Sequence, residues 1–132
     1  MLPAFPASLT VSTGCWLLRA TPPIGFRLSS TVLVRLDPLV LAVFADTLLF
    51  HAVALRGIDD ANRPREGTPL LWLQASPTDS LRVTLGGLSV LEWRFHPQAD
   101  TMQGTLYWGG DLEGPGLAVA GPATATRARC PP

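Results

Sequence analysis

Short apolar runs with a two-residue period recur along the chain and are separated by glycine-rich turns. Residues 31–36 read TVLVRL, in which three aliphatic side chains share one face and Arg35 faces the other. Residues 81–85 repeat this alternation, and Gly86-Gly87 follows, a pair that accepts the positive φ angles of a hairpin turn. Because side chains alternate between faces along a strand, the pattern predicts half-buried antiparallel strands.

Further apolar runs have the length of strands: residues 9–19, 69–74, 88–96 and 104–108. In the third run the inward phase moves from Val90 to Leu91, which predicts a β-bulge there and an outer face for Glu92, Arg94 and His96. Strands at such short intervals predict a mainly β fold, an antiparallel sandwich or small barrel of about seven to nine strands.

Two structures compete for the apolar segment 38–56. As a single buried helix it would have Asp37 as N-cap, a proline at the first helical position and Gly57 as the C-terminal cap. As a hairpin it would turn at Ala45-Asp46-Thr47. Residue propensities favour neither the helix nor the hairpin. The strands expected on either side favour the hairpin, and the helix remains the alternative.

The same segment is the best candidate for a membrane span, over residues 39–55. Its length is at the lower limit for crossing a bilayer, and it contains Asp46 and His51. Both side chains are costly in hydrocarbon, so we expect no membrane span.

Composition changes along the chain and divides it into a domain and a C-terminal segment. We expect one β-rich domain over residues 1–113, which begins with an N-terminal arm at 1–8. Residues 57–69 carry a dense cluster of charge and predict an exposed loop. The segment 114–132 is rich in Gly, Ala and Pro without an amphipathic period, which predicts an extended arm or a disordered tail.

The two cysteines, Cys15 and Cys130, lie near opposite ends of the sequence. The first residues contain two prolines and no basic group, so they make a poor secretory signal and favour synthesis in the reducing cytoplasm. Two separate thiols are therefore the favoured interpretation. The alternative is a disulfide that closes nearly the whole chain.

The charge of the chain is low and balanced, with ten acidic residues and ten basic residues, all of them arginine. A formal net charge of zero argues against nucleic-acid binding, which needs surplus basic groups to replace the counterions of phosphate. It also leaves little electrostatic repulsion between copies of the chain.

No catalytic motif is recognisable. Only loose sets can be written, such as Cys15 with His96 and Asp100, or a serine with His51 and Asp46. There is no G-x-S-x-G elbow, and a chain without lysine has no lysine-containing phosphate loop. We therefore expect no enzymatic activity, no catalytic residue and no cofactor, with His51 buried against a backbone carbonyl and His96 on the surface.

A metal site is not expected either. The spacing of Asp59, Asp60, Asn62 and Glu66 differs from that of the calcium loop, and arginines alternate with these acids, so local ion pairs explain them better. The cysteines and histidines lack the paired short spacing of a zinc site.

The chain has four tryptophans, which in a small β domain are core residues with the indole N–H satisfied at the rim. A ligand platform or an interface is the functional alternative. Because Tyr107 and Trp108 face opposite sides of a strand, they cannot form one platform. The candidate ligand or interface residues are Trp72, Trp93, Arg94 and Trp108.

These observations favour a non-enzymatic structural subunit that self-associates or packs on a larger assembly, with closed rings, above all trimers, hiding the strand edges. Such domains are common among the components of virions and tails, and among capsid decoration proteins in particular. This comparison rests on the kind of domain alone. The alternative is a small-molecule or carbohydrate-binding β-barrel whose excess of apolar residues lines a pocket.

Overall fold

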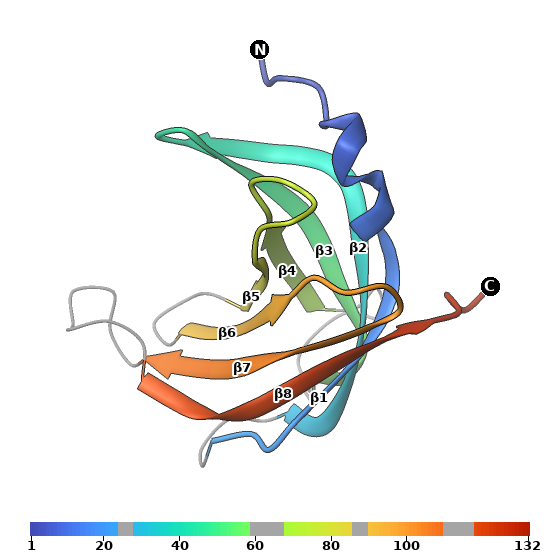
Figure 1. Ribbon diagram of the computed structural model, residues 1–132, viewed down its shortest axis with the longest axis vertical. Helices are drawn as coiled ribbons and strands as arrows, with labels where there is room; N and C mark the ends of the chain where they lie inside the picture. The colour runs from blue at the N-terminus through green and yellow to red at the C-terminus, as the bar shows by residue number, and fades with distance from the viewer. Residues whose placement is uncertain (24–27, 59–67, 86–89, 110–117) are drawn as a thin grey trace.

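The chain folds into one closed β-barrel, shown in Figure 1. A computed structural model describes residues 1–23, 28–58, 68–85, 90–109 and 118–132. Eight antiparallel strands pair in sequence order, and the last pairs with the first. The predicted mainly β fold is confirmed, and of its two architectures the barrel is the one present.

One short helix precedes the strands. The elements are the 3₁₀ helix η1 (Ala7–Ser12), β1 (Gly14–Ala20), β2 (Leu28–Phe44), β3 (Thr47–Ile58), β4 (Thr68–Leu73), β5 (Leu81–Leu85), β6 (Val90–His96), β7 (Thr101–Gly109) and β8 (Ala118–Ala128). No helix among the described residues is long and apolar enough to cross a membrane.

The interior of the barrel is filled by alternate side chains of the strands. In β2 the inward residues are Val32, Val34 and Leu36, as the two-residue period predicts. The tryptophans Trp72 and Trp93 are almost fully buried in the same core. Every strand contributes buried inward residues, so the interior of the barrel is a packed core among the described residues.

Residues 38–56 form the greater part of the hairpin β2–β3, and the helix considered for this segment is wrong. The turn lies at Ala45-Asp46, as the hairpin interpretation predicts. Each strand also has a second neighbour, β1 on one side and β4 on the other. This pairing with neighbouring strands, which local propensity does not contain, selects the strands.

The first candidate strand, 9–19, is only half correct. Its first part is η1, in which the backbone N–H of Leu9 bonds to the carbonyl of Pro6, and β1 begins at Gly14. Leu9 is almost fully buried and belongs to the core. The helical turn of η1 places Leu9 over the end of the barrel, so these residues do not extend strand β1.

The glycine- and alanine-rich tail predicted at 114–132 is wrong over most of its described length. Ala118–Ala128 is strand β8, which pairs with both β1 and β7 and closes the barrel. Its inward residues, Ala123 and Ala125, are buried. Alanine differs little in hydropathy from its neighbours in this segment, so the two-residue period of a strand was not visible in the sequence. In the barrel these small side chains pack against the larger residues of the core.

The remaining predictions on local structure have mixed outcomes. The register of Val90–His96 on β7 runs without a shift, so the bulge predicted at Val90-Leu91 is absent from this described strand. Leu91, Trp93 and Phe95 point inward, as predicted. The predicted turn at Gly86-Gly87 and most of the charged loop 57–69 lie outside the described residues.

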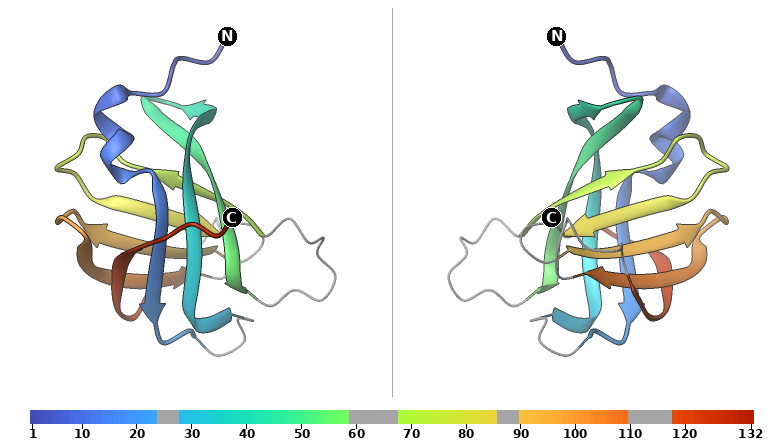
Figure 2. Two further views of the ribbon diagram at one scale, coloured as in Figure 1. Left: turned by 90° about the vertical axis from the view of Figure 1, so that its right-hand side faces the viewer. Right: turned by 90° about the vertical axis from the view of Figure 1, so that its left-hand side faces the viewer.

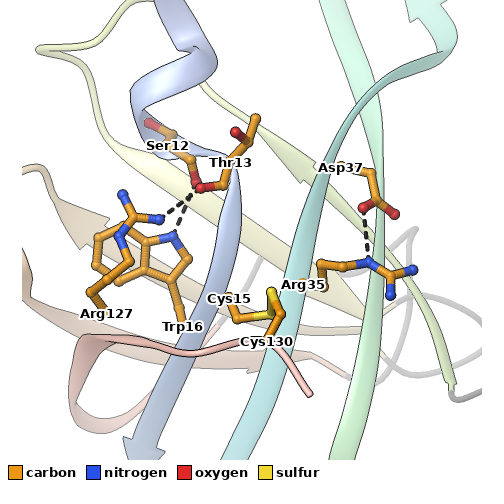
Figure 3. The surroundings of a disulfide bond; sticks show 8 residues. All are labelled: Ser12, Thr13, Cys15, Trp16, Arg35, Asp37, Arg127 and Cys130. Carbon is orange, nitrogen blue, oxygen red and sulfur yellow. Dashed lines mark hydrogen bonds and ion pairs between the residues drawn. A yellow bond between two sulfur atoms is a disulfide. The ribbon is translucent and has the colours of Figure 1, made fainter. Parts of the chain in front are cut away.

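A disulfide joins Cys15 to Cys130, and the interpretation as two separate thiols is wrong (Figure 3). Cys15 lies opposite Ala128 in the β1–β8 pairing, so the end of β8 brings Cys130 beside it. The Cα atoms are 5.3 Å apart, within the usual range for a disulfide. Disulfides persist in oxidising compartments, whereas the sequence favoured a reducing one.

Candidate functional site

The β2–β3 hairpin carries the main exposed apolar surface of the described chain. Leu39, Leu41, Val43 and Phe44 are 53%, 43%, 47% and 76% exposed. No charged residue lies between Asp37 and Asp46. We call these four side chains the hairpin patch. Val43 and Phe44 are consecutive strand residues and face opposite sides, so the patch occupies both faces of the hairpin. Exposed apolar surface of this kind marks interaction sites in proteins.

The tip of the hairpin extends beyond the strands on both sides, which Figure 1 shows at the top of the barrel. The pairing of β1 with β2 ends at Gly14 and Leu36, and the pairing of β3 with β4 ends at Phe50 and Trp72. Beyond these positions the two hairpin strands pair only with each other among the described residues. The patch therefore stands on a two-stranded ribbon.

A polar cluster secures the base of this ribbon. Asp37 accepts a hydrogen bond from Arg35 at 2.9 Å and lies 2.7 Å from Nδ1 of His51. Its backbone carbonyl accepts the indole N–H of Trp72 at 3.1 Å. The expectation of a buried His51 bonded to a backbone carbonyl is wrong, because His51 is part-exposed and pairs with a carboxylate. The cluster holds the irregular stretch of β2 that contains Pro38.

A cleft of about 500 Å³ lies beside the hairpin. It occupies the fork where β3 and β4 stop pairing, between Thr47-Leu48 on one side and Leu73-Gln74 on the other. Pro6, Leu48, Leu73 and Ala75 are the apolar residues on its wall, with the buried Phe50 behind them, and polar groups make up the larger part of its surface. We call this hollow the fork cleft.

Charged groups mark the rim of the fork cleft: Asp46, Asp79 and Arg82. The carboxylate of Asp79 accepts a hydrogen bond from Ser76 within its own loop. Asp46 and Arg82 form no ion pair with other described residues. Arg82 also lies directly opposite Arg94 in the β5–β6 register, so a like charge is its cross-strand neighbour.

The helix η1 and the residues before it lie at the same end of the barrel as the hairpin, as Figure 2 shows from two sides. Phe5 packs with its ring 4.9 Å from that of Phe50 and 5.8 Å from that of Trp72. Ser12 donates to the side chain of the buried Gln74 at 2.6 Å. These contacts close the barrel end and stiffen one wall of the fork cleft.

The structure does not bring the four candidate ligand or interface residues onto one surface. Trp72 and Trp93 are core residues, while Arg94 lies on the outer wall and donates to Glu92 at 2.9 and 2.6 Å. Arg94 also stacks 4.6 Å above the ring of Tyr107. Trp108 is 38% exposed.

The loosely assembled catalytic sets are not supported either. Cys15 is bonded to Cys130 and is no free nucleophile, and His51 pairs with Asp37 instead of Asp46. His96 is exposed, as predicted. No group of three or more metal-ligating side chains occurs among the described residues, and the acidic residues of 59–66 lie outside them.

The chain matches no known protein family, no curated protein and no solved structure at a significant level. The protein is therefore classified by its architecture alone, as a closed eight-stranded antiparallel barrel with a protruding apolar hairpin.

Sequence reasoning did not single out Phe44 of the hairpin patch or Arg82 of the fork cleft, and it named Asp46 only in other roles. A signal was present in the hairpin, because residues 39–44 are apolar at every position and a two-stranded ribbon cannot bury both of its faces. No comparable signal marked Arg82, whose place at the cleft follows from the register of β5 on β4.

Proposed function

We propose that the protein is a non-enzymatic structural subunit that associates with copies of itself or packs on a larger assembly. The observation that carries this proposal is the hairpin patch, four large apolar side chains exposed on a stretch without charged residues between Asp37 and Asp46. Burial of apolar surface is the main driving force of protein association, and charged side chains are depleted at interface centres. The zero net charge of the chain adds no repulsion between copies.

Rigidity is a second feature that suits a structural role. The barrel is closed, and the Cys15–Cys130 disulfide joins its first strand to the residues after its last. Such a subunit would serve as a component of a virion or tail, for example as a capsid decoration protein. A trimeric ring is one arrangement that would cover the patch.

Light scattering coupled to size exclusion tests the proposal directly. We expect oligomers at micromolar concentration, and we expect Leu41→Ser with Val43→Ser to shift the protein towards monomers. Val119→Ser is a matched control, because Val119 is 67% exposed but lies on β8. A monodisperse wild-type monomer across this concentration range would disprove self-association.

A second candidate function, small-molecule binding, has the fork cleft in its favour. Its volume of about 500 Å³ falls within the range of ligand pockets, roughly 300–1,000 Å³. Phe50 lines it and lies 4.7 Å from the ring of Trp72, so a ligand there should change tryptophan fluorescence. No response to a panel of sugars, nucleotides and fatty acids would count against this function.

A further inference from the structure

We propose that the Cys15–Cys130 disulfide is a redox latch: a dithiol opens it on the folded chain, frees residues 129–132 and leaves the barrel closed. An oxidising compartment would hold the C-terminal end on the barrel, and a reducing one would release it with a surface thiol at Cys130. This inference goes beyond the proposed structural role and does not depend on self-association.

The two cysteines lie in different surroundings. Cys15 is the second residue of β1, pairs with Arg35 of β2 and Ala128 of β8, and is 1% exposed. Cys130 follows the end of β8 by two residues, is exposed and belongs to no strand. Backbone pairing therefore fixes Cys15 and leaves Cys130 tied to the barrel through its sulfur.

The disulfide lies on the outer face of the barrel wall. Trp16 and Leu18 of β1 belong to the core, and side chains alternate along a strand, so Cys15 points outward. The exposed Cys130 is bonded to it from outside, as Figure 3 shows beside β1. A reductant thus meets the sulfur of Cys130 before that of Cys15.

Thiol–disulfide exchange opens such a bond without unfolding. A thiolate attacks one sulfur and expels the other, and access decides which sulfur reacts. The first thiolate of the dithiol bonds to Sγ of Cys130, and Cys15 leaves as a thiolate that takes up a proton. The second thiolate then closes the dithiol into its own disulfide and expels Cys130, which is protonated in turn. The dithiol loses two electrons, and the protein disulfide gains them.

Arg127 sets the limit of the freed segment. Its backbone N–H donates to the carbonyl of Asp100 at 2.7 Å. Its guanidinium donates to the carbonyls of Thr13 and Val11 at 2.7 and 2.6 Å and lies 3.9 Å above the ring of Trp16. None of these contacts involves the disulfide, so they persist after reduction.

Strand pairing also holds β8 without the disulfide. Residues 123–128 pair with β1, and residues 118–126 pair with β7 with one shift of register. Residues 129–132, in contrast, are all exposed and belong to no strand. Chain ends of this kind are disordered unless something ties them down. Reduction therefore releases this end and stops at the ladder.

Reduction of the folded full chain tests the access of the disulfide. The oxidised protein would be treated with dithiothreitol, and its thiols trapped with iodoacetamide and located by mass spectrometry. We expect reduction without denaturant, at a rate that changes less than about twofold up to about 1 M urea, because local opening exposes little surface. We also expect Cys130 to be alkylated at least about tenfold faster than Cys15. A reduction rate that rises more than about fivefold per molar of urea, as global unfolding requires, would overturn the latch.

Trypsin tests the state of the reduced chain. We expect cleavage after Arg129 to be at least about tenfold faster in the reduced than in the oxidised protein, with an unchanged far-UV circular dichroism spectrum. The double variant Cys15→Ser with Cys130→Ser should be cleaved like the reduced protein without any reductant. Equal cleavage in both redox states, or loss of the barrel spectrum on reduction, contradicts the proposal.

Arg127→Lys tests the limit of the opening. In the reduced chain we expect cleavage after residue 127 to be at least about tenfold faster in this variant than in wild type, because lysine cannot span both carbonyls. Arg129→Lys is the control and should leave cleavage after residue 127 unchanged. Equal rates in Arg127→Lys and wild type would refute the boundary assigned to residues 129–132.

Discussion

The side chain of Arg127 links several residues at one end of the barrel. Its guanidinium donates to the carbonyl of Thr13 at 2.7 Å and lies 3.9 Å above the ring of Trp16 (Figure 3). It also donates to the carbonyl of Val11 at 2.6 Å. Burial lowers the pKa of Arg127 from its ordinary value, and the charge of Asp100 opposes this shift. The residue therefore ties β8 to the end of η1 as a planar, charged donor.

Replacement of Arg127 by lysine should weaken this tie. Lysine keeps the positive charge but cannot span both carbonyls or stack as a plane, so we expect the free energy of unfolding to fall by about 1.5–3 kcal/mol. Urea denaturation measures the change. Arg129→Lys is the matched control, because Arg129 is exposed, and an equal loss in both variants would contradict a specific role for Arg127.

The β2–β3 hairpin is the element that differs most from a plain barrel wall. Its turn contains Ala45 at φ 54°, a left-handed conformation that favours glycine. Two-residue hairpin turns need such positive angles to match the twist of their strands. The hairpin thus keeps its tip geometry although its turn residue is not the preferred one.

Ala45→Gly should stabilise the protein by about 0.5–1 kcal/mol, because glycine removes the steric cost of the left-handed conformation. Ala42→Gly in the same hairpin should destabilise it by about 0.5–1 kcal/mol, since Ala42 lies in a strand. Thermal unfolding of the two variants measures both effects. A loss of stability in Ala45→Gly would contradict the strain assigned to this turn.

Closure of the barrel depends on the whole chain, because its first and last strands must pair. The strand β8 completes it by pairing with β1 and β7, so no edge remains along the described β1–β8 and β7–β8 pairings. The disulfide acts at the same seam and closes a loop of sequence separation 115, which in the loop-entropy model stabilises by about 4–5 kcal/mol. Chain ends that are distant in sequence therefore meet in one wall.

Removal of residues 118–132 should abolish cooperative folding, because it exposes the edges of β1 and β7 and removes the buried Ala123 and Ala125. Removal of 131–132 alone retains Cys130 and should leave the protein folded. Circular dichroism during urea denaturation distinguishes the two. A cooperative transition in the longer truncation would show that β8 is dispensable.

Local patterns were sufficient wherever inward and outward residues differ in polarity. The strands over 31–36 and 81–85, and the inward set of Leu91, Trp93 and Phe95, follow from alternation alone. The pattern failed at η1, where Leu9 and Val11 alternate like a strand but fold as a helical turn. It also failed at β8, where alanines face the core and threonines or prolines face outward with little contrast in polarity.

The amino-acid sequence by itself determined a β fold, a strand count close to eight and a chain of zero net charge, because these depend on period and composition. Only the tertiary structure decided the hairpin at 38–56, the closing role of β8, the Cys15–Cys130 bond and the meeting of Asp46 with Arg82 at one cleft. Each of these depends on which strands become neighbours. Strand pairing joins residues far apart in the chain, and such contacts leave no periodic signal in the local sequence.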